Sequence, residues 1–161
     1  MSLALIHLFV LIVLANGAPI LARNLLGNKA DYPIDGHLRF IDKRPLFGHS
    51  KTWRGLIASL VLTSLLALLL GYALQTGLLI ALAAMGGDLL TSFIKRRLNL
   101  PSSSMAPLFD QVAESLFPAL LVMKVFALTP WSISLLVLAF ILFDLLFSRL
   151  LYKIGLRRRP Y

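Results

Sequence analysis

Apolar residues in this chain form long runs, separated by short connections and by one long polar loop. Runs of about 20 apolar residues are long enough to cross a bilayer. Lipid admits only helices or closed barrels as spanning structures, because every backbone polar group must be satisfied within the protein. The pattern therefore predicts an all-α integral membrane protein with one transmembrane domain, residues 1–161. Its five predicted transmembrane helices cover roughly residues 3–21, 56–74, 77–94, 107–128 and 131–152.

The first predicted helix contains Asn16-Gly17-Ala18-Pro19 near its end, and we expect the helix to break there. Glycine weakens a helix, and an internal proline removes one of its hydrogen bonds. Irregular backbone at membrane depth is tolerated where it lines a cavity, which makes Asn16 a candidate for binding a substrate. A simple turn at the end of the span explains the same residues equally well.

Composition supports a membrane protein. Of the 161 residues, 58% are hydrophobic and the mean hydropathy is +0.84, whereas soluble domains are nearer about 45–50% apolar. The chain has no cysteine, which excludes disulfides, thiolate catalysis and zinc–thiolate sites.

The charge of the chain is strongly positive and unevenly distributed. A net charge of +9 suggests nucleic-acid binding in a soluble protein. Here 15 of the 16 Lys and Arg residues fall in residues 23–54, 95–97 and 149–159, whereas the connections near Gln75 and Thr129 hold none. Lys and Arg mark cytoplasmic loops. We therefore expect a protein of the cell membrane with its N-terminus outside and its C-terminus cytoplasmic. The loop at about 23–54 and a basic hinge at about 95–106 would face the cytoplasm, and no nucleic-acid partner is expected.

Four acidic residues lie within predicted spans: Asp88, Asp110, Glu114 and Asp144. Asp88 precedes Lys95 by seven residues, and Glu114 follows Pro107 by seven, so both lie roughly 10 Å inside the cytoplasmic boundary. Acids within the membrane face the bundle interior or a watery cavity and usually mark function. The other three acids, which we expect to be solvated loop charges, are Asp31, Asp35 and Asp42.

The gathering of carboxylates predicts a bound cation, because clustered acids repel one another unless a cation holds them. Oxygen ligands without cysteine or a histidine cluster suit Mg²⁺, which takes its remaining ligands from water and substrate phosphates. The candidate metal ligands are Asp88, Asp110 and Glu114. Basic residues at the cytoplasmic mouth could hold phosphate groups, namely Lys51, Arg54, Lys95 and Arg96. Pro107 suits the first position of a helix whose free amides would face the same mouth, and Ser102, Ser103 and Ser104 add hydroxyls before it.

Each of these features also has a purely structural explanation. Asp88 and Lys95 could form a polar clamp between helices, and Asp144 could pair with Arg149 or Lys153. The hinge Lys95-Arg96-Arg97 could be a topology signal alone. Ser92 could bond a phosphate or its own helix backbone. Trp53 could stack on a base, although a place at the membrane interface suits it better.

Several short segments follow one another along the chain: Ala15-Asn16-Gly17-Ala18-Pro19-Ile20, Ile34-Asp35-Gly36, Gly48-His49-Ser50-Lys51-Thr52-Trp53-Arg54-Gly55, Gly87-Asp88 with Ser92-Phe93-Ile94-Lys95-Arg96-Arg97, and Leu108-Phe109-Asp110-Gln111. In this order they resemble the CDP-archaeol synthase family of CTP-dependent lipid-phosphate cytidylyltransferases. The resemblance implies a small five-span enzyme in which a lipid phosphate attacks the α-phosphorus of CTP, giving a CDP-lipid and pyrophosphate. It implies a need for Mg²⁺, held by Asp88 and Asp110, and it points to a homodimer.

The resemblance and the residue chemistry together define one predicted site. The catalytic residues are Asp88, Asp110 and Lys95. The substrate-binding residues are Asn16, Lys51, Thr52, Arg54, Ser92 and Arg96. Two positions depart from the family pattern. Ala113 stands where an Asp is usual, with Glu114 following it, and Gly48-His49-Ser50 stands where Gly-Asp-Gly is frequent.

Three other functions compete with this prediction. A CTP-dependent polyprenol kinase would transfer the γ-phosphoryl group and release CDP. A small cation transporter would also place acids in spans, but it needs a polar path through the outer half of the bundle. A scaffold subunit would leave the buried acids without a purpose.

Overall fold

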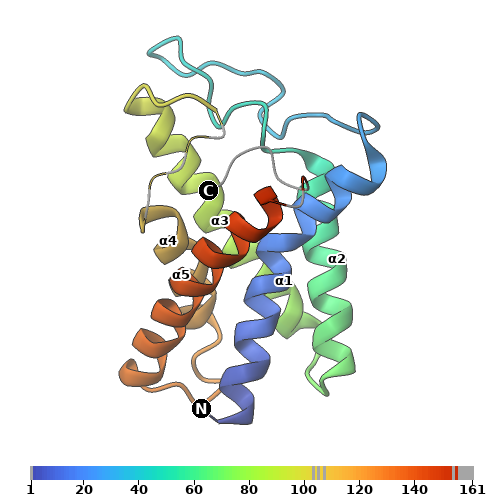
Figure 1. Ribbon diagram of the computed structural model, residues 1–161, viewed down its shortest axis with the longest axis vertical. Coiled ribbons are helices and arrows are strands. Elements are labelled where there is room, and N and C mark those ends of the chain that lie inside the picture. Colours follow the sequence, from blue (N-terminus) through green and yellow to red (C-terminus); the bar gives the residue numbers. More distant parts are fainter. Residues whose placement is uncertain (1, 103, 105, 107, 154, 156–161) are drawn as a thin grey trace.

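The computed structural model describes residues 2–102, 104, 106, 108–153 and 155, and this part of the chain folds into five helices, as predicted (Figure 1). They are α1 (Leu3–Leu26), α2 (Trp53–Leu69), α3 (Leu74–Arg97), α4 (Phe109–Leu121) and α5 (Pro130–Lys153). The helices run alternately up and down (Figure 1). Three are long and apolar enough to cross a membrane: α1, α3 and residues Pro130–Leu150 of α5. With 17 and 13 residues, α2 and α4 are shorter.

The first helix does not break at Pro19, contrary to the expectation from sequence. Helix α1 continues for 24 residues through Asn16-Gly17-Ala18-Pro19. Proline cannot donate the hydrogen bond that the carbonyl of Ala15 would receive within the helix. The hydroxyl of Ser59 on α2 donates to that carbonyl instead, at 2.8 Å. A neighbouring helix therefore satisfies the group that Pro19 leaves free, and the helix stays continuous.

The fourth helix is shorter than predicted. It begins at Phe109 and ends at Leu121 rather than near residue 128, and Pro118 lies inside it. Residues 122–127 form turns, yet Val122 and Phe126 are buried in the main apolar core. Their apolar character thus reflects core packing, which the hydrophobic pattern alone cannot distinguish from helix. Pro107, the predicted first helical residue, lies outside the described residues, as does Ser103.

Helix α3 packs on α1, α2 and α4, and it crosses α2 and α4 closely at glycines. A methyl group at Gly77 would lie 2.6 Å from the Cα of Ser64 on α2. A methyl group at Gly87 would lie 2.6 Å from the carbonyl oxygen of Ala113 on α4. Small residues at crossings let helix backbones approach in membrane proteins. The second crossing brings Asp88, which follows Gly87, to the part of α4 that carries Glu114.

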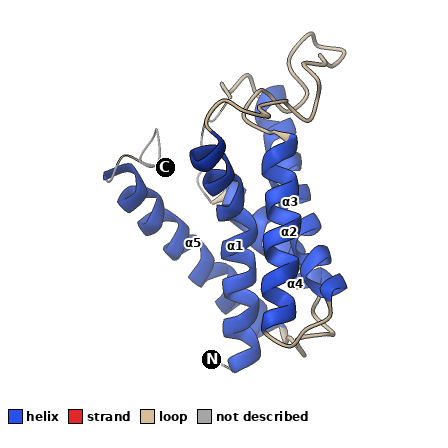
Figure 2. Cartoon of the chain, turned by 90° about the vertical axis from the view of Figure 1, so that its right-hand side faces the viewer, coloured by secondary structure: helices blue, strands red, loops and turns tan. Residues whose placement is uncertain are grey.

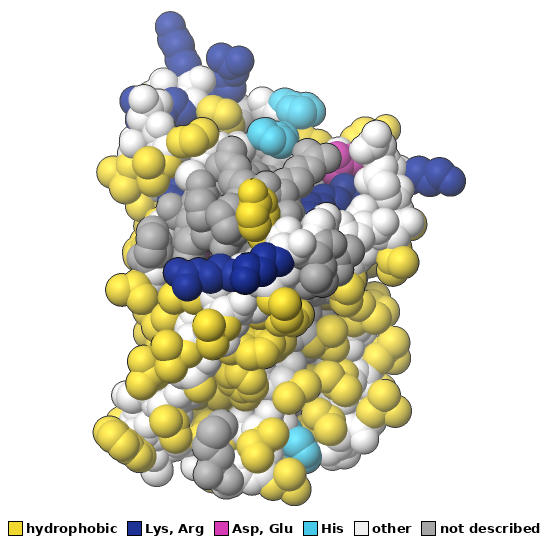
Figure 3. Space-filling view, in the orientation of Figure 1, with side chains coloured by type: hydrophobic (Ala, Val, Ile, Leu, Met, Phe, Trp, Pro, Cys, Tyr) yellow, Lys and Arg dark blue, Asp and Glu magenta, His cyan; other side chains and the backbone are white. Residues whose placement is uncertain are grey.

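The two ends of the bundle differ in character. We call the end with the loop 27–52, the described residues of the hinge 98–108 and the last turn of α5 the polar end. The opposite end, with residues 70–73, 122–129 and the first turn of α1, is called the apolar end. Lys and Arg side chains gather toward the polar end, and hydrophobic side chains cover the surface below them (Figure 3). Helix α5 packs on α4 and α1, and Figure 2 shows it leaning away from α1 toward the polar end.

Candidate functional site

Two lysine–aspartate pairs lie at the polar end. The Nζ of Lys51 lies 2.5 and 2.6 Å from the two carboxylate oxygens of Asp88. The Nζ of Lys95 lies 2.8 Å from Oδ2 of Asp110 and 3.0 Å from the carbonyl of Ser104. The structure thus joins four predicted site residues in two ion pairs. It pairs Asp88 with Lys51 of the loop rather than with Lys95, the partner considered from sequence.

The position of Lys51 follows from the end of the long loop. The amide of Ile34 donates to the carbonyl of Lys51 at 2.8 Å, and Lys51 closes a turn onto the carbonyl of Gly48 at 3.2 Å. Thr52 then caps α2, because its hydroxyl accepts the amide of Gly55 at 3.4 Å. Burial alone would lower the pKa of Lys51, but the negative charges of Asp88, Glu114 and Asp110 outweigh it and raise that pKa. Lys51 is therefore a cation near neutral pH.

Asp110 is held at the start of α4 and keeps one open acceptor. Its Oδ2 also accepts the amide of Ala106 at 3.0 Å, close to the bond from Lys95. Its Oδ1 is buried and has no hydrogen-bond partner among the described residues. A buried acceptor without a partner is costly. This oxygen is thus available to a ligand other than the described residues.

Glu114 completes the group of acids. It interacts electrostatically with Asp88, Lys51, Asp144 and Asp110, so the four acids of the predicted spans do gather in one region. Asp144 joins this region through α4, because Gln111 donates to its Oδ2 at 2.9 Å. Gln111 was not predicted as a site residue. It is 3% exposed, and a glutamine directly after Asp110 in an apolar helix was the signal that could have revealed it.

The residues present fit a hard divalent cation only after rearrangement. Among the described residues, no three His, Cys, Asp or Glu side chains form a ready-made metal site. Lys51 occupies both oxygens of Asp88, and Lys95 occupies Oδ2 of Asp110. Oδ1 of Asp110 and the carboxylate of Glu114 are oxygen donors of the kind that Mg²⁺ prefers. The donor set therefore suits Mg²⁺ once the lysines move.

Asp35 stabilises the loop above the site instead of being a solvated charge, which corrects the expectation from sequence. It is 5% exposed, and it accepts the amides of Phe47 and Gly48 at 2.9 Å and of His37 at 3.1 Å. Burial alone would raise its pKa, but these three amides outweigh burial and lower it. The other loop acids form ion pairs, Asp31 with Arg54 at 2.7 Å and Asp42 with Arg97 at 3.2 Å.

The predicted phosphate-binding arginines are engaged with backbone in this structure. Arg54 donates to the carbonyls of Gly27 at 2.6 Å and Lys29 at 2.7 Å, which ties the start of α2 to the segment after α1. Arg96 donates to the hydroxyl of Ser102 at 2.8 Å and to the carbonyl of Pro101 at 2.9 Å. Arg54 thus supports the loop, whereas Arg96 shapes the hinge beside Lys95.

Two further predicted residues lie on helices. The side-chain amide of Asn16 donates to the carbonyl of Ile12 at 3.0 Å, within α1. Ser92 is buried on α3, one turn after Asp88 and one turn before Arg96.

Arg97, treated as part of a topology signal, packs its guanidinium 4.9 and 4.8 Å from the ring centres of Phe40 and Phe93. It thereby clamps the loop onto the last turn of α3.

A polar cavity of about 160 Å³ lies in the loop close to Lys51. Its lining residues are Asp35, His37, Arg39, Pro45, Gly48, His49 and Ser102. Gly48 starts the turn that ends at Lys51, and Ser102 is the hydroxyl that Arg96 holds. A side chain at Gly48 would strike the hydroxyl of Ser102, only 2.2 Å from a methyl group there. The wall of the cavity is therefore connected to two candidate phosphate-binding residues, to Lys51 through the turn at Gly48 and to Arg96 through Ser102.

Comparison with known proteins gives consistent matches. The family model described as CarS-like, CDP-archaeol synthase, matches residues 2–161. A CDP-archaeol synthase of Hyperthermus butylicus is 42% identical over 104 residues, which is 61% of this chain and 59% of that protein. One of Pyrobaculum calidifontis is 34% identical over 98% of both chains. A solved structure described as an intramembrane enzyme for archaeal membrane lipid biosynthesis superposes with a TM-score of 0.75. It is 30% identical and covers 89% of this chain and 91% of its own.

Proposed function

The chain belongs to the CDP-archaeol synthase family, and on that premise we propose that it is a membrane-embedded CTP-dependent cytidylyltransferase that forms CDP-archaeol and pyrophosphate. One observation carries the proposal. The pairs Lys51–Asp88 and Lys95–Asp110 lie where the polar loops meet the apolar helices. A water-soluble nucleotide and a lipid phosphate can meet only at such a boundary, which explains why costly carboxylates lie in this part of α3 and α4.

In the proposed reaction, an oxygen of the lipid phosphate attacks the α-phosphorus of CTP, and the bond to the β-phosphate breaks to release pyrophosphate. No general base is required, because a phosphate monoester is already anionic at pH 7. The protein positions two anions and offsets their repulsion. Lys51, Lys95 and Arg96 are the cations at the site, and we assign them to the triphosphate and the lipid phosphate. Ser92, between Asp88 and Arg96, is assigned to a phosphate oxygen.

We assign Asp88, Asp110 and Glu114 to holding Mg²⁺, which would supply positive charge to offset the charge of the triphosphate and of the pyrophosphate product. The open Oδ1 of Asp110 and the proximity of Glu114 to Asp88 support this assignment. We propose that Glu114 takes the role of the Asp that is usual at position 113, because Glu114 interacts electrostatically with Asp88 and Asp110. Its longer side chain reaches the same region from the next position on α4.

We assign the polar cavity of the loop to the nucleoside part of CTP. Because the turn from Gly48 leads directly to Lys51, a base in the cavity would leave the triphosphate directed toward the two lysines. Thr52 caps α2 and fixes that turn. Arg54 anchors the loop to the end of α1, so we expect it to act on the site through Lys51.

We further propose five membrane crossings, with the N-terminus outside and the polar end in the cytoplasm of the cell. The distribution of 15 of 16 Lys and Arg residues supports this orientation. At about 1.5 Å per residue α4 is only about 20 Å long, so residues 122–128 complete its crossing. A homodimer remains a prediction, and light scattering of the protein in detergent would measure it.

Product analysis tests the proposed function. The purified protein in detergent would be given CTP and Mg²⁺ with one of four lipids: an unsaturated archaeal-type ether phosphate, phosphatidate, a polyprenyl phosphate or free polyprenol. We expect pyrophosphate and a CDP-lipid, with the ether phosphate preferred. Release of CDP with free polyprenol would instead indicate the kinase. Absence of CTP turnover with every lipid would contradict both activities and favour transport or a scaffold role.

A further inference from the structure

We infer that Lys51 and Lys95 are exchangeable counter-ions, which pair with the candidate metal carboxylates in the free protein and move to phosphate oxygens when a metal–nucleotide complex binds. The site would therefore accept the divalent cation together with the triphosphate, and only poorly without it. The inference rests on the proposed function, because it names how the same site is loaded. It adds a role for the lysines that precedes the reaction.

The geometry of the two pairs supports the exchange. Lys51 contacts both oxygens of Asp88, at 2.5 and 2.6 Å. A cation that binds this carboxylate must therefore displace the ammonium group of Lys51. Lys95 contacts one oxygen of Asp110 and leaves Oδ1 buried without a partner among the described residues. The pairs thus occupy three of the four carboxylate oxygens of Asp88 and Asp110, and the fourth has no partner among the described residues.

Electrostatics gives the direction of the exchange. Buried carboxylates must be paired, and removal of one partner is strongly unfavourable. Two ammonium groups provide this pairing, but they also repel a bare dication arriving beside the same acids. A triphosphate changes the balance, because its oxygens offer both lysines new anionic partners as the metal takes over the carboxylates. Each buried carboxylate and each lysine then keeps an oppositely charged partner before and after the exchange.

The side chains and their anchors suit this movement. Lysine carries a compact charge on a flexible four-carbon stem, whereas arginine favours a fixed, bidentate geometry. Lys51 stands at the end of a loop, and Lys95 stands in the last turn of α3, at the polar end. Each neighbouring arginine is held by two hydrogen bonds besides any ion pair, Arg54 to the carbonyls of Gly27 and Lys29, and Arg96 to Ser102 and Pro101. Lys95 makes one such bond, to the carbonyl of Ser104. The cations that can move are therefore those that face the acids.

Binding of Mn²⁺, followed by electron paramagnetic resonance in detergent, tests the inference without any turnover. The wild-type protein should bind Mn²⁺ weakly alone and at least about tenfold more tightly with a CTP analogue that has a methylene bridge between its α- and β-phosphorus. Lys51→Met should bind Mn²⁺ alone at least about tenfold more tightly than wild type, and should lose most of the gain from the analogue. Lys95→Met should change in the same direction.

Lys124→Met is the matched control, because Lys124 is exposed at the apolar end, and it should match wild type. Equal affinity for Mn²⁺ alone in wild type, Lys51→Met and Lys95→Met would overturn the inference, as would tight binding of Mn²⁺ to wild type without nucleotide. Thermal unfolding identifies a variant that fails to fold, and the other lysine variant then decides. Failure of the proposed function is a separate result: the coupling between Mn²⁺ and the analogue would persist while no CDP-lipid forms.

Discussion

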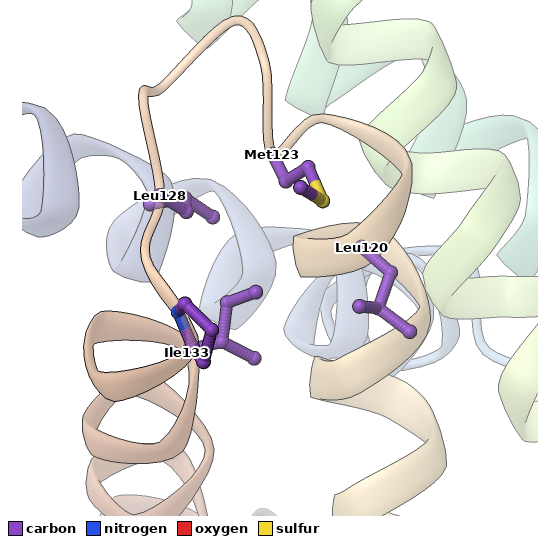
Figure 4. Close-up of a pocket in the computed structure, with 5 residues that line it drawn as sticks. Leu120, Met123, Leu128 and Ile133 are labelled. Atoms are coloured by element: carbon purple, nitrogen blue, oxygen red, sulfur yellow. The ribbon is translucent and has the colours of Figure 1, made fainter.

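The two ends of the bundle are built on the same helices but hold opposite kinds of interior. At the polar end, two lysine–aspartate pairs and a cavity of about 160 Å³ with acidic, basic and histidine walls lie together. At the apolar end, a cavity of about 260 Å³ lies between the facing ends of α4 and α5, with the purely apolar lining Leu120, Met123, Leu128, Pro130 and Ile133 (Figure 4). A cavity alone therefore does not identify the site. The ion pairs beside the polar cavity do, with three charged residues from α3 and α4 and one, Lys51, from the loop.

The two glycine crossings of α3 show the same contrast. At Gly77, toward the apolar end, close approach brings only Ser64 and other small side chains of α2 against α3. At Gly87, equally close approach of α4 brings Asp88 near Glu114. The packing device is the same at both crossings. Its consequence depends on whether the neighbouring positions carry charge.

The largest expected effect is that of Asp110→Asn, which would remove a carboxylate from the polar end without changing its volume. We expect CTP turnover to fall by about 10³-fold or more, since charge stabilisation of this kind supplies much of the rate in such sites. Turnover assays and thermal unfolding in detergent would measure it. Asp42→Asn is the control, because this exposed loop residue lies outside the site, and its turnover should stay within about twofold of wild type. Activity retained by Asp110→Asn would refute the assignment.

Substitution at the two crossings would sharpen the comparison next. Gly87→Ala places a methyl group against Ala113 and should separate α3 from α4, lowering CTP turnover by about 10- to 100-fold. Gly77→Ala should cost about 1–3 kcal/mol of stability through the same overpacking, with little change in KM for CTP. Turnover and unfolding of both variants would be measured side by side. Equal losses of CTP turnover in the two variants would show that the crossings are not functionally distinct.

Asp35→Asn tests the loop above the site. The change weakens three amide contacts and should destabilise the loop by about 1–3 kcal/mol, seen as faster protease cleavage within residues 36–47 and a raised KM for CTP. The pKa of Asp35 is lowered in the folded protein. Its stabilisation is thus complete above the ordinary value of 3.8 and is lost as the pH falls through the lower folded value. Protease resistance that declines between pH 8 and pH 5 would contradict this role.

The smallest effect on activity should come from the apolar end. Leu128→Ala enlarges the apolar cavity and should cost about 2–5 kcal/mol of stability. The KM for CTP should stay within about twofold, because no charged group of the site contacts this region. Thermal unfolding and CTP titration would measure both. If Leu128→Ala changed the KM for CTP more than Asp35→Asn does, the apolar end would affect CTP binding as strongly as the polar end, which would contradict the comparison.

Much of this protein was predictable from local features of its sequence. The apolar runs predicted the helices because burial in lipid demands them whatever their neighbours are. The acids in α3, α4 and α5 stood out because isolated charge in an apolar segment is costly. The predictions that were wrong treated a segment without the neighbours that it packs against. Helix α1 did not break at Pro19, because the hydroxyl of Ser59 donates to the Ala15 carbonyl in place of the amide that proline lacks. Helix α4 ends early because the chain after Leu121 forms turns that pack in the core.

The sequence by itself determined the class of the protein, the positions of its acids and the end of the bundle to which most cations belong. Only the tertiary structure decided the partners: Lys51 rather than Lys95 for Asp88, Gln111 for Asp144, and three backbone amides for Asp35. Helix formation and charge cost are local properties that each segment carries with it. Pairing depends on which helices cross and how a loop returns over them, and these relations exist only after distant segments have packed.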